Sequence, residues 1–114
     1  MTPVSTSQLH AGQVFEIIFP EFVPRITIQS ERELTIEIIS GVNAGFIDTV
    51  EYEAITLCEG LVLLSWQEHI GSTIVHVLDL FSTKAHTFVT PAQGGFMRLK
   101  GQLKVRFSCQ ENIN

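Results

Sequence analysis

The sequence has no apolar run long enough to cross a bilayer as a helix, and it has few basic residues. No hydrophobic stretch approaches the length of about 18 residues that a membrane-spanning helix needs. Seven Lys and Arg stand against twelve Asp and Glu, which gives a formal net charge of −5. Because a chain of this charge repels polyphosphate, we expect neither a membrane partner nor a nucleic-acid partner.

Cysteines and the common catalytic motifs are also scarce. Cys58 and Cys109 lack C-x-x-C spacing, so we interpret them as buried thiols in a reducing compartment, with a disulfide as the alternative. Residues 1–12 show neither the basic nor the apolar region of a signal peptide, so we expect a cytoplasmic location. The sequence contains no Gly-rich phosphate loop and no G-x-S-x-G motif, and its histidines lack metal-ligand spacing. We therefore expect no metal and no nucleotide cofactor.

What the sequence does contain is a regular pattern of strands and turns. With 114 residues, 45% hydrophobic and 17% charged, the chain fits one globular domain over residues 1–114. Turn residues recur about every ten positions, and β-branched and aromatic residues dominate between them, which is typical of an all-β domain. The predicted strands cover residues 13–19, 25–29, 33–40, 48–58, 61–69, 72–81, 84–90 and 96–108.

The turns between these strands are short. Glu59-Gly60, Ile70-Gly71 and Ser82-Thr83 can each close a tight hairpin, whereas residues 20–24 and 91–95 mark looser corners. Eight antiparallel strands in sequence order predict an up-and-down β-barrel, because closure removes the exposed edges of a sheet.

The last two of these tight turns predict a register. Across the Ile70-Gly71 turn Trp66 faces Val75, and across the Ser82-Thr83 turn Asp79 faces His86. A slip of one residue would exchange the two faces of the hairpin. The period of two puts Glu68, Trp66, Asp79 and His86 on one face of the hairpin, which we take as the inner one. It puts His69 and His76 on the other face.

The predicted outer face of this hairpin is apolar as well. Two apolar faces exceed what a barrel interior requires, so we expect a partner subunit or the amino-terminal segment to cover the outer one. We expect a homodimer. The residues of this face are Leu61, Leu63, Ile74, Leu78 and Leu80.

Residues 57–91, LCEGLVLLSWQEHIGSTIVHVLDLFSTKAHTFVTP, carry a resemblance. They resemble the pattern shared by the MoaF-like proteins and the phenolic acid decarboxylases, in which a glycine and a hydrophobic run lead to W-x-E, a glycine turn and another strand. Upstream, IISGVNAG resembles the S-G-x-x-x-G corner of the decarboxylases, and YEAI resembles the MoaF side. Both families are lipocalin-like (calycin) barrels, so the resemblance implies that fold.

The resemblance does not carry the decarboxylase activity over. Decarboxylases use the glutamate of W-x-E, which is Glu68 here, together with an arginine before the S-G corner and two tyrosines on the first strand. Glu37 takes the place of the arginine, and the first strand offers Phe15 and Ile17. Because an acidic residue repels a substrate carboxylate in a low-dielectric pocket, we expect phenolic acid decarboxylation to be absent.

A barrel of eight strands can be filled by side chains or can hold one small ligand. Glu68 and Glu37 are candidate ligand-binding residues, or else solvated groups at the barrel mouth. Trp66 fills the core or stacks on a ligand, and Tyr52 has a structural or a binding role. Asp79 and His86 form a structural hydrogen bond or an acid–base pair.

Three functions remain open from the sequence. The first is a small-molecule-binding protein of the MoaF-like type, whose largely apolar ligand lies in the barrel with an uncharged or cationic head at Glu68. The second is an enzyme on the same barrel, with Glu68 as general acid or base and Tyr52 or His86 as its partner. The third is an assembly module with a filled barrel.

Overall fold

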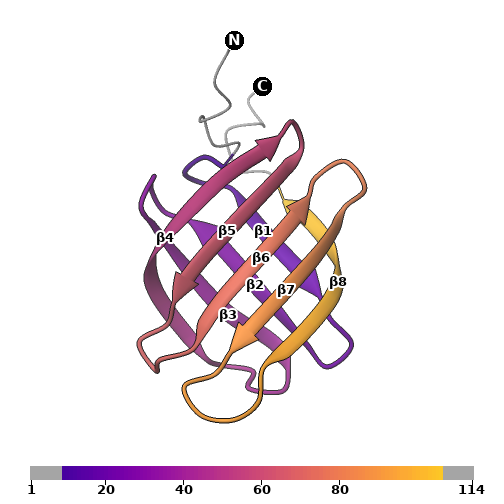
Figure 1. Cartoon of the computed structure of the whole chain (residues 1–114). Coiled ribbons are helices and arrows are strands. Elements are labelled where there is room, and N and C mark those ends of the chain that lie inside the picture. The colour runs from indigo at the N-terminus through magenta and orange to yellow at the C-terminus, as the bar shows by residue number, and fades with distance from the viewer. Residues whose placement is uncertain (1–8, 107–114) are drawn as a thin grey trace.

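The computed structural model describes residues 9–106 and forms one closed antiparallel barrel (Figure 1). Each strand pairs with the next along the chain, and the last pairs with the first. The predicted all-β, lipocalin-like up-and-down barrel is therefore confirmed. Within residues 9–106 no helix could cross a membrane. The strands are β1 (Val14–Ile18), β2 (Phe22–Ile28), β3 (Glu33–Gly41), β4 (Ile47–Cys58), β5 (Leu61–Gln67), β6 (Thr73–Asp79), β7 (Lys84–Thr90) and β8 (Met97–Arg106).

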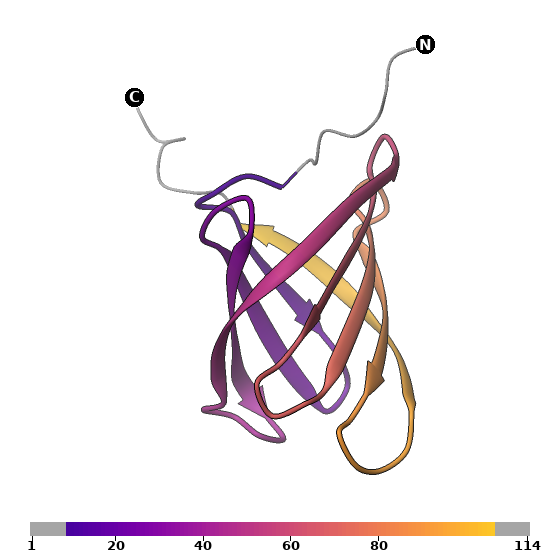
Figure 2. The same cartoon turned by 60° about the vertical axis from the view of Figure 1, so that its left-hand side comes forward.

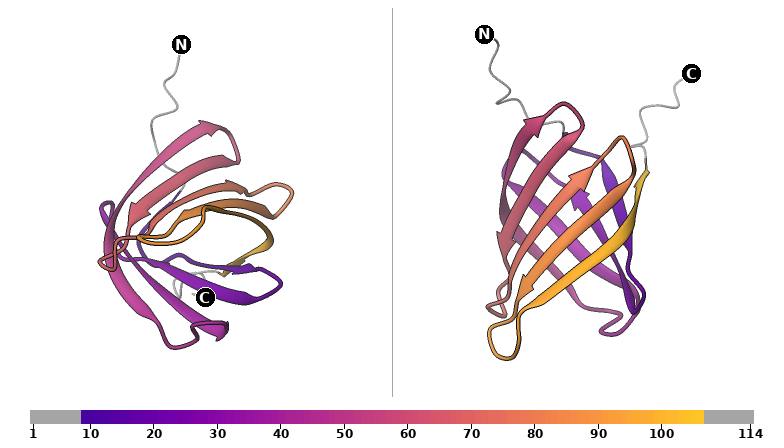
Figure 3. Two further views of the ribbon diagram at one scale, coloured as in Figure 1. Left: turned by 60° about the horizontal axis from the view of Figure 1, so that its bottom comes forward. Right: turned by 45° about the vertical axis from the view of Figure 1, so that its right-hand side comes forward.

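The turns alternate between the two ends of the barrel. The β2–β3, β4–β5 and β6–β7 turns lie at the end that is uppermost in Figure 1, which we call the upper end. The other four turns lie at the lower end. The views of Figure 3 show the tilted strands from below and from the side of β6, β7 and β8, which lie next to one another.

Alternation along each strand places one set of side chains inside the barrel. In β3 the apolar residues at even positions are buried between partly exposed ones, as expected for a strand with one face on a core. Proline interrupts β2 without ending it, because the β2–β3 ladder shifts its register between Val23 and Pro24. The largest fully buried side chains are Phe15, Ile17, Ile26, Ile28, Leu34, Leu64, Leu78, Leu103, Val62 and Thr87.

The β4–β5 turn agrees with the prediction, since Cys58 pairs with Leu61 across Glu59-Gly60. One interpretation there was wrong. Cys58 is exposed, not buried, because it ends β4 at a tight turn on the rim of the barrel. Cys109 lies outside the described residues.

The predicted β5–β6 turn was wrong by one residue. Gln67 pairs with Thr73, and Glu68 donates its backbone N–H to the carbonyl oxygen of Ser72 at 2.8 Å. The loop therefore has three residues and not two, and it ends with Gly71 at φ 100°, as in three-residue hairpins that close with a left-handed glycine. Consequently Trp66 faces Ile74 and not Val75.

The predicted β6–β7 turn was also wrong. Asp79 pairs with Lys84 and not with His86, so the loop has four residues. The carboxylate of Asp79 accepts the backbone N–H groups of Phe81 at 3.1 Å and Ser82 at 3.0 Å. Aspartate commonly closes a turn in this way. Asp79 therefore holds a loop and does not form a cross-strand pair with His86.

The one-residue shift at the β5–β6 turn exchanges the faces of β6 and β7, whereas the two-residue shift at the β6–β7 turn leaves the faces unchanged. Trp66 and Glu68 point into the barrel, as predicted, and are only 4% and 8% exposed. His76, predicted outside, is buried inside, and so are Ile74 and Leu78 of the predicted outer patch. The outer face of the β5–β6 hairpin instead carries the half-buried side chains of Leu61, Leu63, Ser65, Val75 and Val77.

Two glycines of the β3–β4 corner allow a matched test of how tightly the backbone packs at the lower end. Gly41 and Gly45 both have positive φ, but a Cβ on Gly41 would collide with the carbonyl oxygen of Glu21, whereas a Cβ on Gly45 meets nothing within 4 Å. We expect Gly45→Ala to lower the free energy of unfolding by about 1–2 kcal/mol through backbone strain alone. Gly41→Ala should cost at least about 2 kcal/mol more. Urea denaturation of both variants measures the difference, and equal costs would contradict this packing.

Candidate functional site

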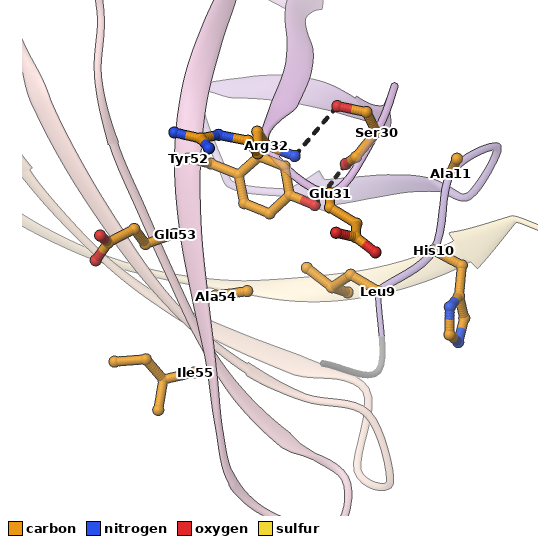
Figure 4. Close-up of a pocket in the computed structure, with 10 residues that line it drawn as sticks. All are labelled: Leu9, His10, Ala11, Ser30, Glu31, Arg32, Tyr52, Glu53, Ala54 and Ile55. Atoms are coloured by element: carbon orange, nitrogen blue, oxygen red, sulfur yellow. Dashed lines mark hydrogen bonds between the residues drawn. The ribbon is translucent and has the colours of Figure 1, made fainter. Parts of the chain in front are cut away.

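A groove with a volume of about 880 Å³ lies at the upper end of the barrel. Three pieces of chain border it: the segment before β1, the β2–β3 turn and the second half of β4 (Figure 4). The lining residues are Leu9, His10, Ala11, Ser30, Glu31, Arg32, Tyr52, Glu53, Ala54 and Ile55.

The groove follows from unequal strand lengths. β4 has 12 residues, whereas β3 has nine and its pairing with β4 ends at Glu33 and Glu51. Beyond that point β4 continues beside β5, and Figure 2 shows it leaning away from the β2–β3 turn. The side chain of Leu9 enters this opening and joins the hydrophobic core.

The centre of the groove is apolar with one carboxylate. In Figure 4, Leu9, Ala54 and the ring of Tyr52 converge, and Glu31 lies beside them, while Glu53 and Ile55 point away. The hydroxyl of Tyr52 donates to the carbonyl oxygen of Ser30 at 2.8 Å. Burial, with the negative charge of Glu31, raises the pKa of Tyr52, so its hydroxyl stays protonated. The site therefore combines an apolar floor with an acidic rim.

Two other predicted site residues adjoin the groove through Tyr52. Trp66 is its cross-strand partner, and the indole N–H of Trp66 donates to Oε2 of Glu68 at 3.2 Å. Burial raises the pKa of Glu68, the bond from Trp66 opposes this, and the charge of Asp48 adds to it. Tyr52, Trp66 and Glu68 thus form one connected row on the inner wall.

Asp48 and His69 form a latch that the sequence reading missed. The backbone N–H of His69 donates to Asp48 at 2.9 Å, and its Nδ1 lies 2.8 Å from the other carboxylate oxygen. Desolvation alone would raise the pKa of Asp48, but the hydrogen bonds from His69 outweigh it and lower that pKa. The latch ties the β5–β6 turn to the start of β4. The two residues are 21 positions apart, so spacing gave no signal.

His76 is the second residue that the sequence reading misplaced. Its Nδ1 lies 2.6 Å from the hydroxyl of Thr87, and its ring centroid lies 5.0 Å from that of Trp66. Complete burial lowers the pKa of His76 to about 3, so the ring is neutral near pH 7. Its Nε2 has no hydrogen-bond partner among residues 9–106. An unpaired buried polar atom of this kind costs about 1–3 kcal/mol.

The three remaining candidates lie on the outer side of the wall. Glu37 alternates with buried isoleucines of β3 and is the cross-strand partner of Arg25. His86 is exposed between two buried residues of β7, and Asp79 holds the β6–β7 loop. The structure therefore does not bring Glu37, Asp79 or His86 to Glu68. In the described chain, no group of three or more His, Cys, Asp or Glu could hold a metal ion.

The sequence was compared with the profiles of known protein families. The sequence profile of the MoaF-like family matches residues 11–104. The chain belongs to the MoaF-like family.

A solved structure supports the same relationship. The crystal structure of a candidate beta-lactamase from Burkholderia vietnamiensis is similar to this MoaF-like protein, with 27% sequence identity and a TM-score of 0.82. The match covers 90% of this chain and 100% of that one. The comparison with curated proteins gives no match. The predicted resemblance to MoaF-like barrels is confirmed.

The first strand of this MoaF-like barrel bears on the decarboxylase comparison. Phe15 and Ile17 point inward and are 1% and 0% exposed. The sequence resemblance sets these two residues at the positions where the decarboxylases have their tyrosines. The inner wall of β1 therefore offers no phenolic hydroxyl to a substrate.

The buried imidazole predicts how the stability of this MoaF-like protein depends on pH. The unfolded chain binds a proton at His76 below about pH 6.5, whereas the folded chain does so only near a pKa of about 3. The free energy of unfolding should therefore fall as the pH drops from 6.5 toward 3, and His76 contributes up to about 1.4 kcal/mol per pH unit to that fall. His76→Leu should have a shallower pH dependence.

Urea denaturation between pH 7 and 4, followed by Trp66 fluorescence, measures these slopes. His86→Leu is the matched control, because it removes an exposed imidazole from the neighbouring strand, and it should keep the wild-type slope. Equal slopes for wild type and His76→Leu would show that the imidazole is not buried in solution.

Proposed function

We propose that this MoaF-like barrel is a small-molecule-binding protein whose ligand lies in the groove at the upper end. The supporting observation is the cavity of about 880 Å³ with an apolar centre and a nearby carboxylate. Ligand sites in proteins are commonly concave, of about 300–1,000 Å³, and mostly apolar with a few placed polar groups. The barrel below the groove is filled by large side chains, which favours the rim over the centre of the barrel.

The charges of the groove favour an uncharged or cationic ligand head. Glu31 lies beside the apolar centre, and its carboxylate has no ion-pair partner within the described range 9–106. Glu53 and Arg32 both point away from the centre in Figure 4, so Glu31 sets the charge there. An ammonium or hydroxyl group can bind Glu31, while an anion would be repelled. The body of the ligand would pack on Leu9, Ala54 and the ring of Tyr52.

Glu68, the anchor predicted from the sequence, lies beside the β5–β6 turn at the lower end and is not among the residues that line the groove. The ligand proposed for the groove is therefore anchored by Glu31 and not by Glu68. The raised pKa of Glu68 favours the second candidate, an enzyme with Glu68 as general acid or base. Of the two partners expected, only Tyr52 remains on the same wall. Turnover of hydroxycinnamic acids or other acids would support this candidate.

The related Burkholderia structure raises beta-lactam hydrolysis as a further activity. Serine beta-lactamases of class A carry an S-x-x-K motif, and this sequence contains none. We therefore keep ligand binding as the proposal. The cytoplasmic location expected from the sequence is part of the same proposal.

Substitutions in the groove test the proposal. Ala54→Leu adds three carbon atoms to the apolar floor and should weaken ligand binding at least about tenfold, because it fills the space of the ligand. Ala44→Leu is the matched control, since Ala44 is exposed on the β3–β4 loop at the other end. The assay is ligand-observed NMR with a mixed library of neutral, cationic and anionic molecules. Binding that survives Ala54→Leu unchanged would remove the groove from consideration.

A second pair of variants tests the charge of the site. Glu31→Gln should weaken the binding of cationic ligands and leave the binding of neutral ligands unchanged. The control Glu21→Gln, an exposed change at the lower end, should leave both unchanged. Selective binding of anions by the wild type would show that our assignment of the charge is wrong.

We also propose a homodimer, formed through the outer face of β5 and β6. Leu61, Leu63, Val75 and Val77 are only half-buried in the single chain, and apolar faces of this kind often mark interfaces. Multi-angle light scattering should give twice the chain mass of 12.7 kDa. Leu63→Lys, in the middle of the face, should give the monomer mass. The control Thr49→Lys, at an exposed position of β4, should keep the dimer mass. A monomer mass for the wild type at high concentration would contradict the proposal.

A further inference from the structure

The imidazole of His76 stands in an apolar part of the interior. Its cross-strand neighbours are Leu64 on β5 and Thr87 on β7, and the ring of Trp66 lies against it. Thr87 occupies Nδ1, and Nε2 has no hydrogen-bond partner within the described chain. A leucine would fill such a position without leaving a polar atom unpaired. A histidine there therefore calls for a partner at Nε2.

The other polar side chains of the same wall do have partners. Tyr52 donates to the carbonyl oxygen of Ser30, and Glu68 accepts from Trp66. Nε2 of His76 is the side-chain atom of this kind that stays unmatched among residues 9–106. It therefore marks the point of the inner wall that a further polar partner would satisfy.

We propose that Nε2 of His76 anchors an interior binding position for one uncharged hydroxyl group. An ion is disfavoured, because Leu64, Leu78 and Trp66 surround the position with apolar surface and would desolvate a charge. A hydroxyl suits either tautomer of the ring. If Thr87 donates to Nδ1, then Nε2 carries the hydrogen and needs an acceptor; if Nδ1 donates to Thr87, then Nε2 needs a donor.

The hydroxyl has two sources, a water molecule or an organic ligand that enters through the groove. Buried waters commonly bind otherwise unpaired polar groups. For the organic source, Ala54, Leu64 and His76 lie in one cross-strand row, and Ala54 is both its smallest member and part of the groove. A ligand that passes from the groove over Ala54 has to displace the side chain of Leu64, which is fully buried between Ala54 and His76. This second source rests on the proposed function, whereas the first does not.

NMR of the wild-type protein labelled with ¹⁵N-histidine tests the position without any substitution. The ring nitrogen shifts of His76 report its tautomer, and cross peaks between its ring protons and long-lived water report a bound water. Titration with benzyl alcohol, and with toluene as the matched probe that lacks the hydroxyl, reports an organic source. We expect either a water cross peak, or a shift of Nε2 with benzyl alcohol that toluene does not produce.

Two variants separate this proposal from that of the groove. Ala54→Leu should abolish the shift with benzyl alcohol and leave the water cross peak in place, so failure of the groove does not remove the interior position. Thr87→Val removes the partner of Nδ1, and the water cross peak or the response to benzyl alcohol at Nε2 should persist in this variant. The absence of both a water cross peak and a shift that depends on benzyl alcohol overturns the proposal. A ring-current shift of a hydrogen on Nε2 would then identify the aromatic face of Trp66 as its partner.

Discussion

The barrel closes through β1, a strand of only five residues that must pair on both sides. It meets β8 over its whole length but β2 over only three residues. The buried carboxylate of Glu16 reinforces both seams, because it lies 3.0 Å from Arg25 on β2 and 3.5 Å from Arg106 on β8. A carboxylate with so little exposure depends on its partners. The side chain of Glu16, on the outer side of the barrel wall but covered by its two arginine partners, therefore links three strands.

Close approach of the backbones completes the same seam. A Cβ at Gly101 on β8 would lie 2.8 Å from the carbonyl oxygen of Ile18 and 2.9 Å from side-chain atoms of Ile17 and Phe19. Glycine at this position lets β8 lie directly against β1. Closure matters for the candidate site because it fixes which side chains face inward on every strand. With the first and last strands joined, no edge remains along which the ladder could slip.

The sequence predicted those parts of the fold that depend on one strand at a time. Alternation within β5 put Trp66 and Glu68 on one face, and the W-x-E resemblance implied that this face is the inner one, which holds even though the register across the next turn was wrong. Side chains on β6 could not be placed in the same way, because their face depends on the number of residues in the preceding loop. One extra loop residue, closed by Gly71, was enough to move His76 from the predicted outer face into the core.

The same reasoning explains which parts of the candidate site were found. Tyr52 was predicted because a lone tyrosine on an apolar strand face needs a partner for its hydroxyl, and Ser30 supplies it. The groove itself could not be predicted, since it comes from the part of β4 that continues past its last pair with β3, at Glu51, and from Leu9 entering the core. Neither feature leaves a local signal in the sequence.

The two ends of the barrel are closed by different kinds of interaction. At the lower end, charged hydrogen bonds between Asp48 and His69 hold the β5–β6 turn. At the upper end, the segment before β1 is held by backbone bonds between Gly12, Gln13 and Ile28, and Leu9 provides the apolar contact. Apolar contacts lack the directionality of hydrogen bonds. The side chain of Leu9 can therefore shift along the apolar floor of the groove more easily than the hydrogen-bonded pair of Asp48 and His69 can rearrange, which makes the upper end the one better suited to exchange a molecule with solvent.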